Sequence, residues 1–250
     1  MKKYFVTIFY FLSLLLLWQL IAVYKLISPS IIPSPSEFFI ALPSLLSKDE
    51  FLPDVISTLT RSSIAFILSV PIGIIIGYLI FYSKWFRQPN EFLLDFVRSI
   101  PSTALIPLFM ISFGIGDVTK IAVGIFSSSL IICISTIQGL KSRNITRLTV
   151  SKIAGFSNIK RFLYLDIPES LSQIFVGLRA GVSLSLILVV VSEMFIGSNN
   201  GLGKVINDMR YSDAIPKLYC ALFATGLIGY FYNIILINIE NKIFHWKGNI

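Results

Sequence analysis

The sequence predicts an all-α, polytopic membrane protein with about six transmembrane helices in a single domain over residues 1–250. Hydrophobic residues make up 55% of the chain and charged residues only 14%, whereas an ordinary soluble domain carries about 25% charged residues. The apolar residues also form blocks of about 20, the length that a helix needs to cross a hydrocarbon core of roughly 30 Å. This composition excludes a disordered chain, a disulfide scaffold and most soluble enzymes.

The first apolar block begins after Lys2 and Lys3, a start that signal peptides share. Its apolar run is about twice the usual signal-peptide core, and no small-residue cleavage site follows Ile27, so we favour a retained helix. The third block contains Pro101 and Pro107, which predict a kinked or broken span that neighbouring helices complete. The six predicted spans cover about residues 4–27, 62–82, 92–113, 118–140, 171–196 and 218–239.

The basic residues predict the orientation. Six of the 21 lysines and arginines lie between residues 141 and 161, and cytoplasmic loops carry an excess of these residues. We therefore expect this loop and both termini to be cytoplasmic, with the segment 28–61 on the opposite side. The same bias accounts for the net charge of +8 without a nucleic-acid partner.

The predicted spans contain few ionisable side chains, which argues against the ion relay of a proton- or sodium-driven transporter. Arg179 is expected to snorkel towards the cytoplasmic surface, and Glu193 to reach the outer interface. Asp95 and Arg98 lie three positions apart on one helix face and are expected to pair.

No motif for catalysis is present: the chain has no phosphate-binding glycine loop, zinc-protease motif or nucleophile elbow. Cys133 and Cys220 are isolated within apolar runs, which indicates packing residues rather than metal ligands or a redox pair. The single histidine, His245, lies in the C-terminal tail. We therefore predict no catalytic residue, metal or cofactor, so uphill transport would take its energy from another chain.

Small residues recur at every fourth position in three spans, a pattern that lets helix backbones approach closely in a bilayer. We expect these positions to be helix-packing sites. They are Gly73 and Gly77, with Ala65 and Ser69, in the second span, Gly177 and Gly181, with Ser185, in the fifth, and Ala221, Thr225 and Gly229 in the sixth.

The loop at about residues 148–168 is basic and amphipathic. Ile153, Phe156 and Ile159 recur at helical spacing and continue into Phe162 or Leu163, while lysines and an arginine occupy other faces. Such a helix either lies on anionic lipid headgroups or docks its apolar stripe into a groove of a soluble partner. The pattern alone favours neither interpretation.

Gly155 and Pro168 are thirteen residues apart, with Leu165 and Ile167 between them. This spacing resembles the EAA loop of permease subunits of bacterial ABC importers, in the nitrate, sulfonate, taurine and bicarbonate group. The stretches at 98–120 and 174–203 are similar to the same family. The Glu-Ala-Ala triplet of the family falls on Thr149, Val150 and Ser151, so the acidic residue is missing here.

The resemblance implies a MetI-like type I importer permease in the inner membrane of a bacterium, and the small-residue stripes suit helices that slide on one another. It would form the pathway for a small solute, an anion such as a sulfonate, taurine or nitrate. The implied partners are ABC ATPase subunits, an extracytoplasmic solute-binding protein and a second permease copy in a homodimer. A self-contained channel or secondary transporter is the alternative.

Two sets of site residues follow from the resemblance. ATPase coupling would use Ala154, Gly155, Phe156, Ile159 and Pro168, with Gly155 forming the turn between two short helices and Pro168 ending the second. The rim that meets the binding protein would contain Asn199, Asn200, Gly201 and Gly203. Polar residues near Pro101 (Ser99, Ser102, Thr103) and in the fourth span (Ser127–Ser129) either face a water-filled path or hydrogen-bond to their own helices.

Overall fold

The computed structural model describes residues 2–28, 31–47, 50–83 and 87–244, so His245 lies outside the described residues. Within these ranges every regular element is a helix, and five helices are long and apolar enough to cross a membrane, or six when one bent pair counts as a span. The elements are α1 (Lys2–Val23), α2 (Pro35–Leu46), α3 (Phe51–Tyr82), α4 (Arg87–Ser99), η1 (Ser102–Leu105), α5 (Ile106–Phe113), α6 (Asp117–Lys141), α7 (Ile145–Ile153), α8 (Asn158–Arg161), the π-helical turn η2 (Phe162–Asp166), α9 (Ile167–Ile196), α10 (Leu202–Tyr211) and α11 (Ile215–Ile243).

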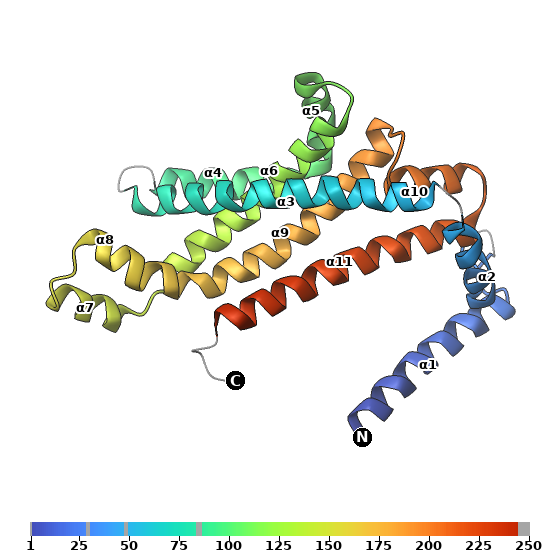
Figure 1. Cartoon of the computed structure of the whole chain (residues 1–250), viewed down its shortest axis with the longest axis horizontal. Helices are drawn as coiled ribbons and strands as arrows, with labels where there is room; N and C mark the ends of the chain where they lie inside the picture. Colours follow the sequence, from blue (N-terminus) through green and yellow to red (C-terminus); the bar gives the residue numbers. More distant parts are fainter. Residues whose placement is uncertain (1, 29–30, 48–49, 84–86, 245–250) are drawn as a thin grey trace.

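Three helices, α3, α6 and α9, pack against one another and form the centre of the protein (Figure 1). Glycines let them approach: a Cβ on Gly73 of α3 would lie 2.6 Å from the carbonyl oxygen of Ser129 in α6. A Cβ on Gly177 of α9 would lie 2.5 Å from the Cβ of Ser135. The other two glycines of the predicted packing set make similar contacts with α6, Gly77 with Thr136 and Gly181 with Ile132.

The second membrane helix is longer than the hydropathy indicates. It begins at Phe51, so the first eleven residues of α3 belong to the segment expected outside the membrane. The same segment contains α2, which starts at a capping box: the Ser34 hydroxyl accepts from the backbone N–H of Glu37, and the Glu37 carboxylate accepts from that of Ser34. Polar side chains in the first turns of α3 lower its hydropathy and conceal this start.

The first helix stands away from the rest of the chain. Trp18 anchors α1 by donating its indole N–H to the carbonyl of Pro33 at 2.9 Å and by stacking edge-on against Phe38. Most other apolar side chains of α1, such as Phe9 and Phe11, are exposed. This helix therefore presents its surface to lipid or to another protein chain.

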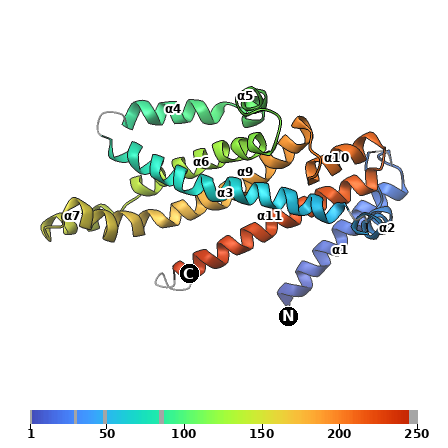
Figure 2. The same ribbon diagram turned by 45° about the horizontal axis from the view of Figure 1, so that its top comes forward.

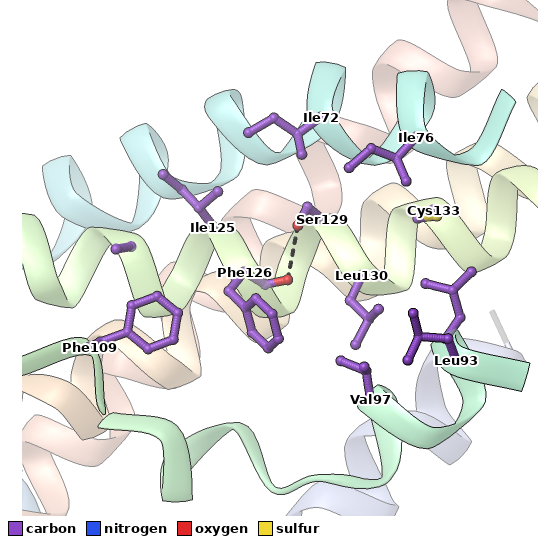
Figure 3. Close-up of a pocket in the computed structure, with 12 residues that line it drawn as sticks. Ile72, Ile76, Leu93, Val97, Phe109, Ile125, Phe126, Ser129, Leu130 and Cys133 are labelled. Carbon is purple, nitrogen blue, oxygen red and sulfur yellow. Dashed lines mark hydrogen bonds between the residues drawn. The ribbon is translucent and has the colours of Figure 1, made fainter. Parts of the chain in front are cut away.

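The third predicted span is broken. Helices α4 and α5 meet at an angle of 86° around Pro101, with the short helix η1 between them, as the two prolines predict. Figure 2 shows this pair on one side of α6. An apolar cavity of about 510 Å³ separates α4 and α5 from α3 and α6 (Figure 3). Its lining includes Ile76, Leu93, Val97 and Phe126.

Candidate functional site

Helices α7 and α8 form a helical hairpin (residues 145–161) that projects beyond the ends of α3 and α6 (Figure 1). The Asn144 side chain caps α7 by accepting from the backbone N–H groups of Thr146 and Arg147. Gly155 adopts a φ of +67° at the turn, a left-handed conformation that glycine accommodates without strain. The turn predicted at Gly155 is therefore present.

The surface of the α7–α8 hairpin carries exposed apolar side chains. Ile153 and Ile159 are 82% and 73% exposed, and Ala154 beside them is also exposed. Phe156 is half-buried, with the Lys160 ammonium 4.6 Å from the centre of its ring. The predicted stripe continues into Leu163, which is exposed.

Phe162 points the other way, into the protein. Its ring packs edge-on against Tyr78 and Tyr82 of α3, with centroid distances of 5.1 and 6.1 Å. Some apolar residues of this segment are thus exposed on the surface, whereas Phe162 packs inside the protein. The three- to four-residue spacing in the sequence does not distinguish these two groups.

The carboxylate of Asp166 is fully buried where the hairpin joins α9. It accepts hydrogen bonds from the hydroxyl of Tyr82 in α3 and the guanidinium of Arg143 after α6, and Arg161 of α8 lies 3.7 Å away. We call Tyr82, Arg143, Arg161 and Asp166 the α7-end cluster. Because a buried carboxylate is stable only when its charge is compensated, this cluster fixes the base of the hairpin to all three central helices.

The expectation that Pro168 ends the second short helix is wrong. The chain continues from α8 through the π-helical turn η2 into α9 without a break, and Pro168 lies in the first turn of α9. The wider π turn accommodates the missing N–H of the proline. Glu169, the next residue, accepts hydrogen bonds from the Arg147 side chain at 3.1 Å and the Asn144 backbone N–H at 2.9 Å. The continuous helix and the Glu169 contacts together join the hairpin firmly to the start of α9.

A comparison with protein families identifies the chain. The family described as binding-protein-dependent transport system inner membrane component matches residues 69–245, a range that contains the whole α7–α8 hairpin. The chain belongs to this family. It is therefore an ABC transporter permease, a non-enzymatic transport subunit of a system that includes ATPase and binding-protein partners. This excludes the alternative of a self-contained channel or secondary transporter.

The permease is similar over most of its length to several named relatives. It is 29% identical to the formylaminopyrimidine transport permease protein ThiX of Halalkalibacterium halodurans (95% of this chain, 94% of the relative). It is 24% identical to the taurine transport system permease protein TauC of Escherichia coli (95% and 88%). It is 27% identical to the nitrate import permease protein NrtB of Synechocystis (76% and 68%).

A solved structure confirms the predicted MetI-like fold. A chain of the MetNI methionine ABC transporter, in inward facing conformations, superposes with a TM-score of 0.62 at 16% identity and covers 76% of the permease and 96% of that chain. At this level of identity the similarity concerns the fold alone.

Helix α10 lies at the opposite end of the central helices from the hairpin (Figure 1). Beside it, a second group of buried polar side chains surrounds Glu193 of α9. The Glu193 carboxylate accepts from the Arg61 guanidinium at 2.7 Å, from the Thr58 hydroxyl at 2.8 Å and from the backbone N–H of Gly203 at 3.0 Å. Asp54 accepts from the N–H of Gly201 at 2.7 Å. We call Asp54, Thr58, Arg61 and Glu193 the α10-end cluster. It caps the start of α10 and binds it to α3 and α9.

This arrangement corrects the expectation for Glu193. Its side chain does not reach an interface: the residue is 1% exposed and paired with Arg61, 132 positions earlier. Arg61 also donates to the carbonyl of Asn200 at 2.7 Å and lies 2.9 Å from Asp117. An acidic residue inside an apolar span was visible in the sequence, but its partner in the segment expected outside the membrane was not.

The predicted rim residues separate into two pairs. Asn199 and Asn200 are exposed. Gly201 and Gly203 are buried within the α10-end cluster, where a Cβ on either residue would collide with Glu193. The glycines therefore allow close packing, and the two asparagines form the accessible surface.

The two arginines within the predicted spans make simple ion pairs. Arg98 pairs with Asp95 at 3.0 Å, as predicted, and Arg179 with Glu240 of α11 at 3.2 Å. Among the described residues, no group of three or more His, Cys, Asp and Glu side chains could hold a metal ion.

Proposed function

We propose that this permease forms the pathway of an ATP-driven importer for a small anionic solute, such as a sulfonate, taurine or nitrate. It would work as a homodimer in the bacterial inner membrane with both termini cytoplasmic. An extracytoplasmic binding protein would deliver the solute, and two ATPase subunits would drive the cycle. Similarity to taurine and nitrate permeases supports an anion, and similarity to ThiX makes a formylaminopyrimidine the competing solute.

The observation that carries this proposal is the family match through the α7–α8 hairpin. The hairpin exposes Ile153 and Ile159 beside the half-buried Phe156, and an apolar surface of this kind suits the groove of a soluble partner. It projects from the end where the basic loop lies, which the charge bias assigns to the cytoplasm. Ala154, Gly155, Phe156, Ile159 and Pro168 would therefore act in ATPase coupling, the first four in the contact surface and turn and Pro168 in the continuation into α9.

The exposed Asn199 and Asn200 would meet the binding protein. They lie at the α10 end, opposite the hairpin, on a loop whose backbone is fixed by Arg61 and Asp54. A rigid loop loses little conformational entropy when it binds a partner, which favours such a contact surface.

Reconstitution tests the function directly. Proteoliposomes are prepared with the permease and its co-encoded ATPase, and the binding protein is added outside. They are expected to accumulate radiolabelled taurine or nitrate only when ATP is enclosed in the vesicles, on the side of the ATPase. Selective uptake of a formylaminopyrimidine would show that this compound, and not an anion, is the transported solute. Accumulation by the permease alone without nucleotide would overturn the proposal.

A substitution tests the coupling surface. Phe156→Ala and Ile159→Ala are expected to uncouple ATP hydrolysis from transport, because one buried anchor typically contributes about 2 kcal/mol or more to an interface. Ile40→Ala, which truncates an exposed side chain of α2 far from the hairpin, is the control and should leave coupling intact. Solute-stimulated ATPase activity that is unchanged in both hairpin variants would count against the assignment.

Thiol labelling tests the orientation. A membrane-impermeant reagent added to whole cells should modify Asn199→Cys but not Phe156→Cys. Modification of Phe156→Cys under these conditions would contradict a cytoplasmic hairpin.

A further inference from the structure

The first helix of the broken span, α4, carries a polar face. Glu91, Asp95 and Arg98 follow at helical spacing on α4, and Ser99 and Ser102 continue this face past the last turn. Arg98 lies eleven residues after the start of α4, about 16 Å along a helix that rises 1.5 Å per residue. Ionisable residues so far into a span face a water-filled cavity or another protein rather than lipid.

A cavity lies beside this face. It has a volume of about 490 Å³ and is lined by the end of α4, η1, α6 and α9. Arg98, Ser99 and Ser102 line it from the broken span, and Ser127 lines it from α6. The apolar cavity between α4 and α3 (Figure 3) contains no charged residue in its lining. These two cavities therefore differ in chemistry.

The hydroxyl of Ser127 is an independent sign of a missing ligand. The residue is 4% exposed, yet its Oγ has no hydrogen-bond partner among the described residues. Its neighbour Ser128 instead donates to the carbonyl of Gly181 at 2.8 Å. Buried hydroxyls are normally satisfied, so a group that enters the cavity can supply the bond that Ser127 lacks.

The donors around the cavity suit an oxoanion. A guanidinium presents several N–H groups in a plane that matches carboxylate and other oxoanion groups, and serine hydroxyls donate further bonds. Among the residues that the structure describes, Arg98 forms an ion pair with Asp95 alone, and both side chains are more than half exposed. Such a pair is weak, so Arg98 can exchange Asp95 for a ligand. Arg179, the other arginine of the predicted spans, pairs with Glu240 and does not line this cavity.

We propose that Arg98, Ser99, Ser102 and Ser127 form a subsite, partway across the membrane, that binds the sulfonate or other oxoanion group of the solute as it passes. The inference rests on the proposed function, because it assigns to the same pathway a place where an anionic solute is held. It makes this subunit a contributor to solute selection beside the binding protein.

Charge-selective labelling tests the subsite without requiring transport. The ATPase-bound permease carrying Ser102→Cys is treated with a methanethiosulfonate reagent that bears a sulfonate group and with its trimethylammonium analogue. The measured quantity is the ratio of the reaction rate of the sulfonate reagent to that of the cationic reagent. This ratio should be about tenfold higher at Ser102→Cys than for a free thiol in solution, because the charge of Arg98 attracts the anionic reagent. Sodium methanesulfonate should slow its reaction. Both native cysteines are buried and provide a low background.

Two further variants make the result specific. Arg98→Gln in the Ser102→Cys background should abolish the preference or reverse it, since Asp95 then remains alone. Arg179→Gln is the matched control and should leave it unchanged. A Ser102→Cys thiol that reacts with neither reagent, or a preference unaffected by Arg98→Gln, would overturn the subsite.

ATP-dependent uptake, measured in parallel, separates the two proposals. Uptake without the labelling preference refutes the subsite and leaves the importer standing. A labelling preference without ATP-dependent uptake refutes the importer and leaves an anion site in the membrane.

Discussion

Removal of the Glu193 carboxylate should destabilise the permease more than any other single truncation of an acidic side chain in α9. Glu193→Ala leaves Arg61 without its closest charged partner and the N–H of Gly203 without an acceptor. Breaking a buried ion pair from one side costs about 3–5 kcal/mol. Asp117, 2.9 Å from the Arg61 Nε, offsets part of this cost, while the unsatisfied N–H adds about 1–3 kcal/mol. We expect a net loss of about 4 kcal/mol in the free energy of unfolding.

The measurement is the free energy of unfolding in mixed micelles as the mole fraction of sodium dodecyl sulfate increases, followed by far-ultraviolet circular dichroism. Glu193→Gln keeps the shape and one acceptor, so it should cost only about 1–2 kcal/mol. Glu240→Ala is the matched control, since it also removes one partner of an arginine pair that involves α9, but a partly exposed one. Exposed pairs contribute about 0.2–1 kcal/mol.

A double-mutant cycle decides whether the pair itself is responsible. Arg61→Ala combined with Glu193→Ala should cost at least about 1.5 kcal/mol less than the sum of the single changes, because residues in one network are coupled. Additivity within about 0.5 kcal/mol is typical of independent sites and would refute the reasoning, as would equal losses for Glu193→Ala and Glu240→Ala.

Three further predictions concern other positions. Gly73→Ala should lower the free energy of unfolding by about 1–3 kcal/mol through overpacking against α6, whereas Gly226→Ala, whose Cβ would meet no atom within 4 Å, should raise it by up to about 1 kcal/mol in the same micelle titration. Gly155→Ala should strain the left-handed turn by about 1–2 kcal/mol, visible as faster amide exchange in the α7–α8 hairpin. Asp166→Asn should loosen the base of the hairpin, and limited trypsin digestion should then cleave at Arg161 faster than in the unchanged protein.

The features of the fold that depend on local sequence were predictable. Apolar length revealed the membrane helices, Pro101 the break in the third span, and Gly155 the turn of the hairpin. The Asp95–Arg98 pair followed from three-residue spacing on one helix. Each of these features depends either on interactions within about one helical turn or on the apolar length that a bilayer requires. A single stretch of sequence contains the information for either one.

The two buried clusters were not predictable in the same way, because their members are far apart in sequence. Arg61 and Glu193 are 132 residues apart, and Tyr82 and Asp166 are 84 apart. A charge within or beside an apolar run, as at Glu193 and Asp166, signals that a partner exists. It does not identify the partner, which only the packing of α3 against α9 supplies.

These clusters also bear on how the central helices move. Asp166 and Glu193 lie at opposite ends of α9, about 40 Å apart at 1.5 Å per residue, and both bind to α3, through Tyr82 at one end and through Thr58 and Arg61 at the other. Small residues between the two ends would allow α3 and α9 to slide, as the sequence suggests, but sliding would break buried charged contacts at both ends at once. The cost of unpaired buried charges opposes it. A displacement of the α7–α8 hairpin is therefore expected to reach the loop at 197–201 as a tilt of α3, α6 and α9 together. The loosely packed broken span and α1 are then the elements that absorb the change.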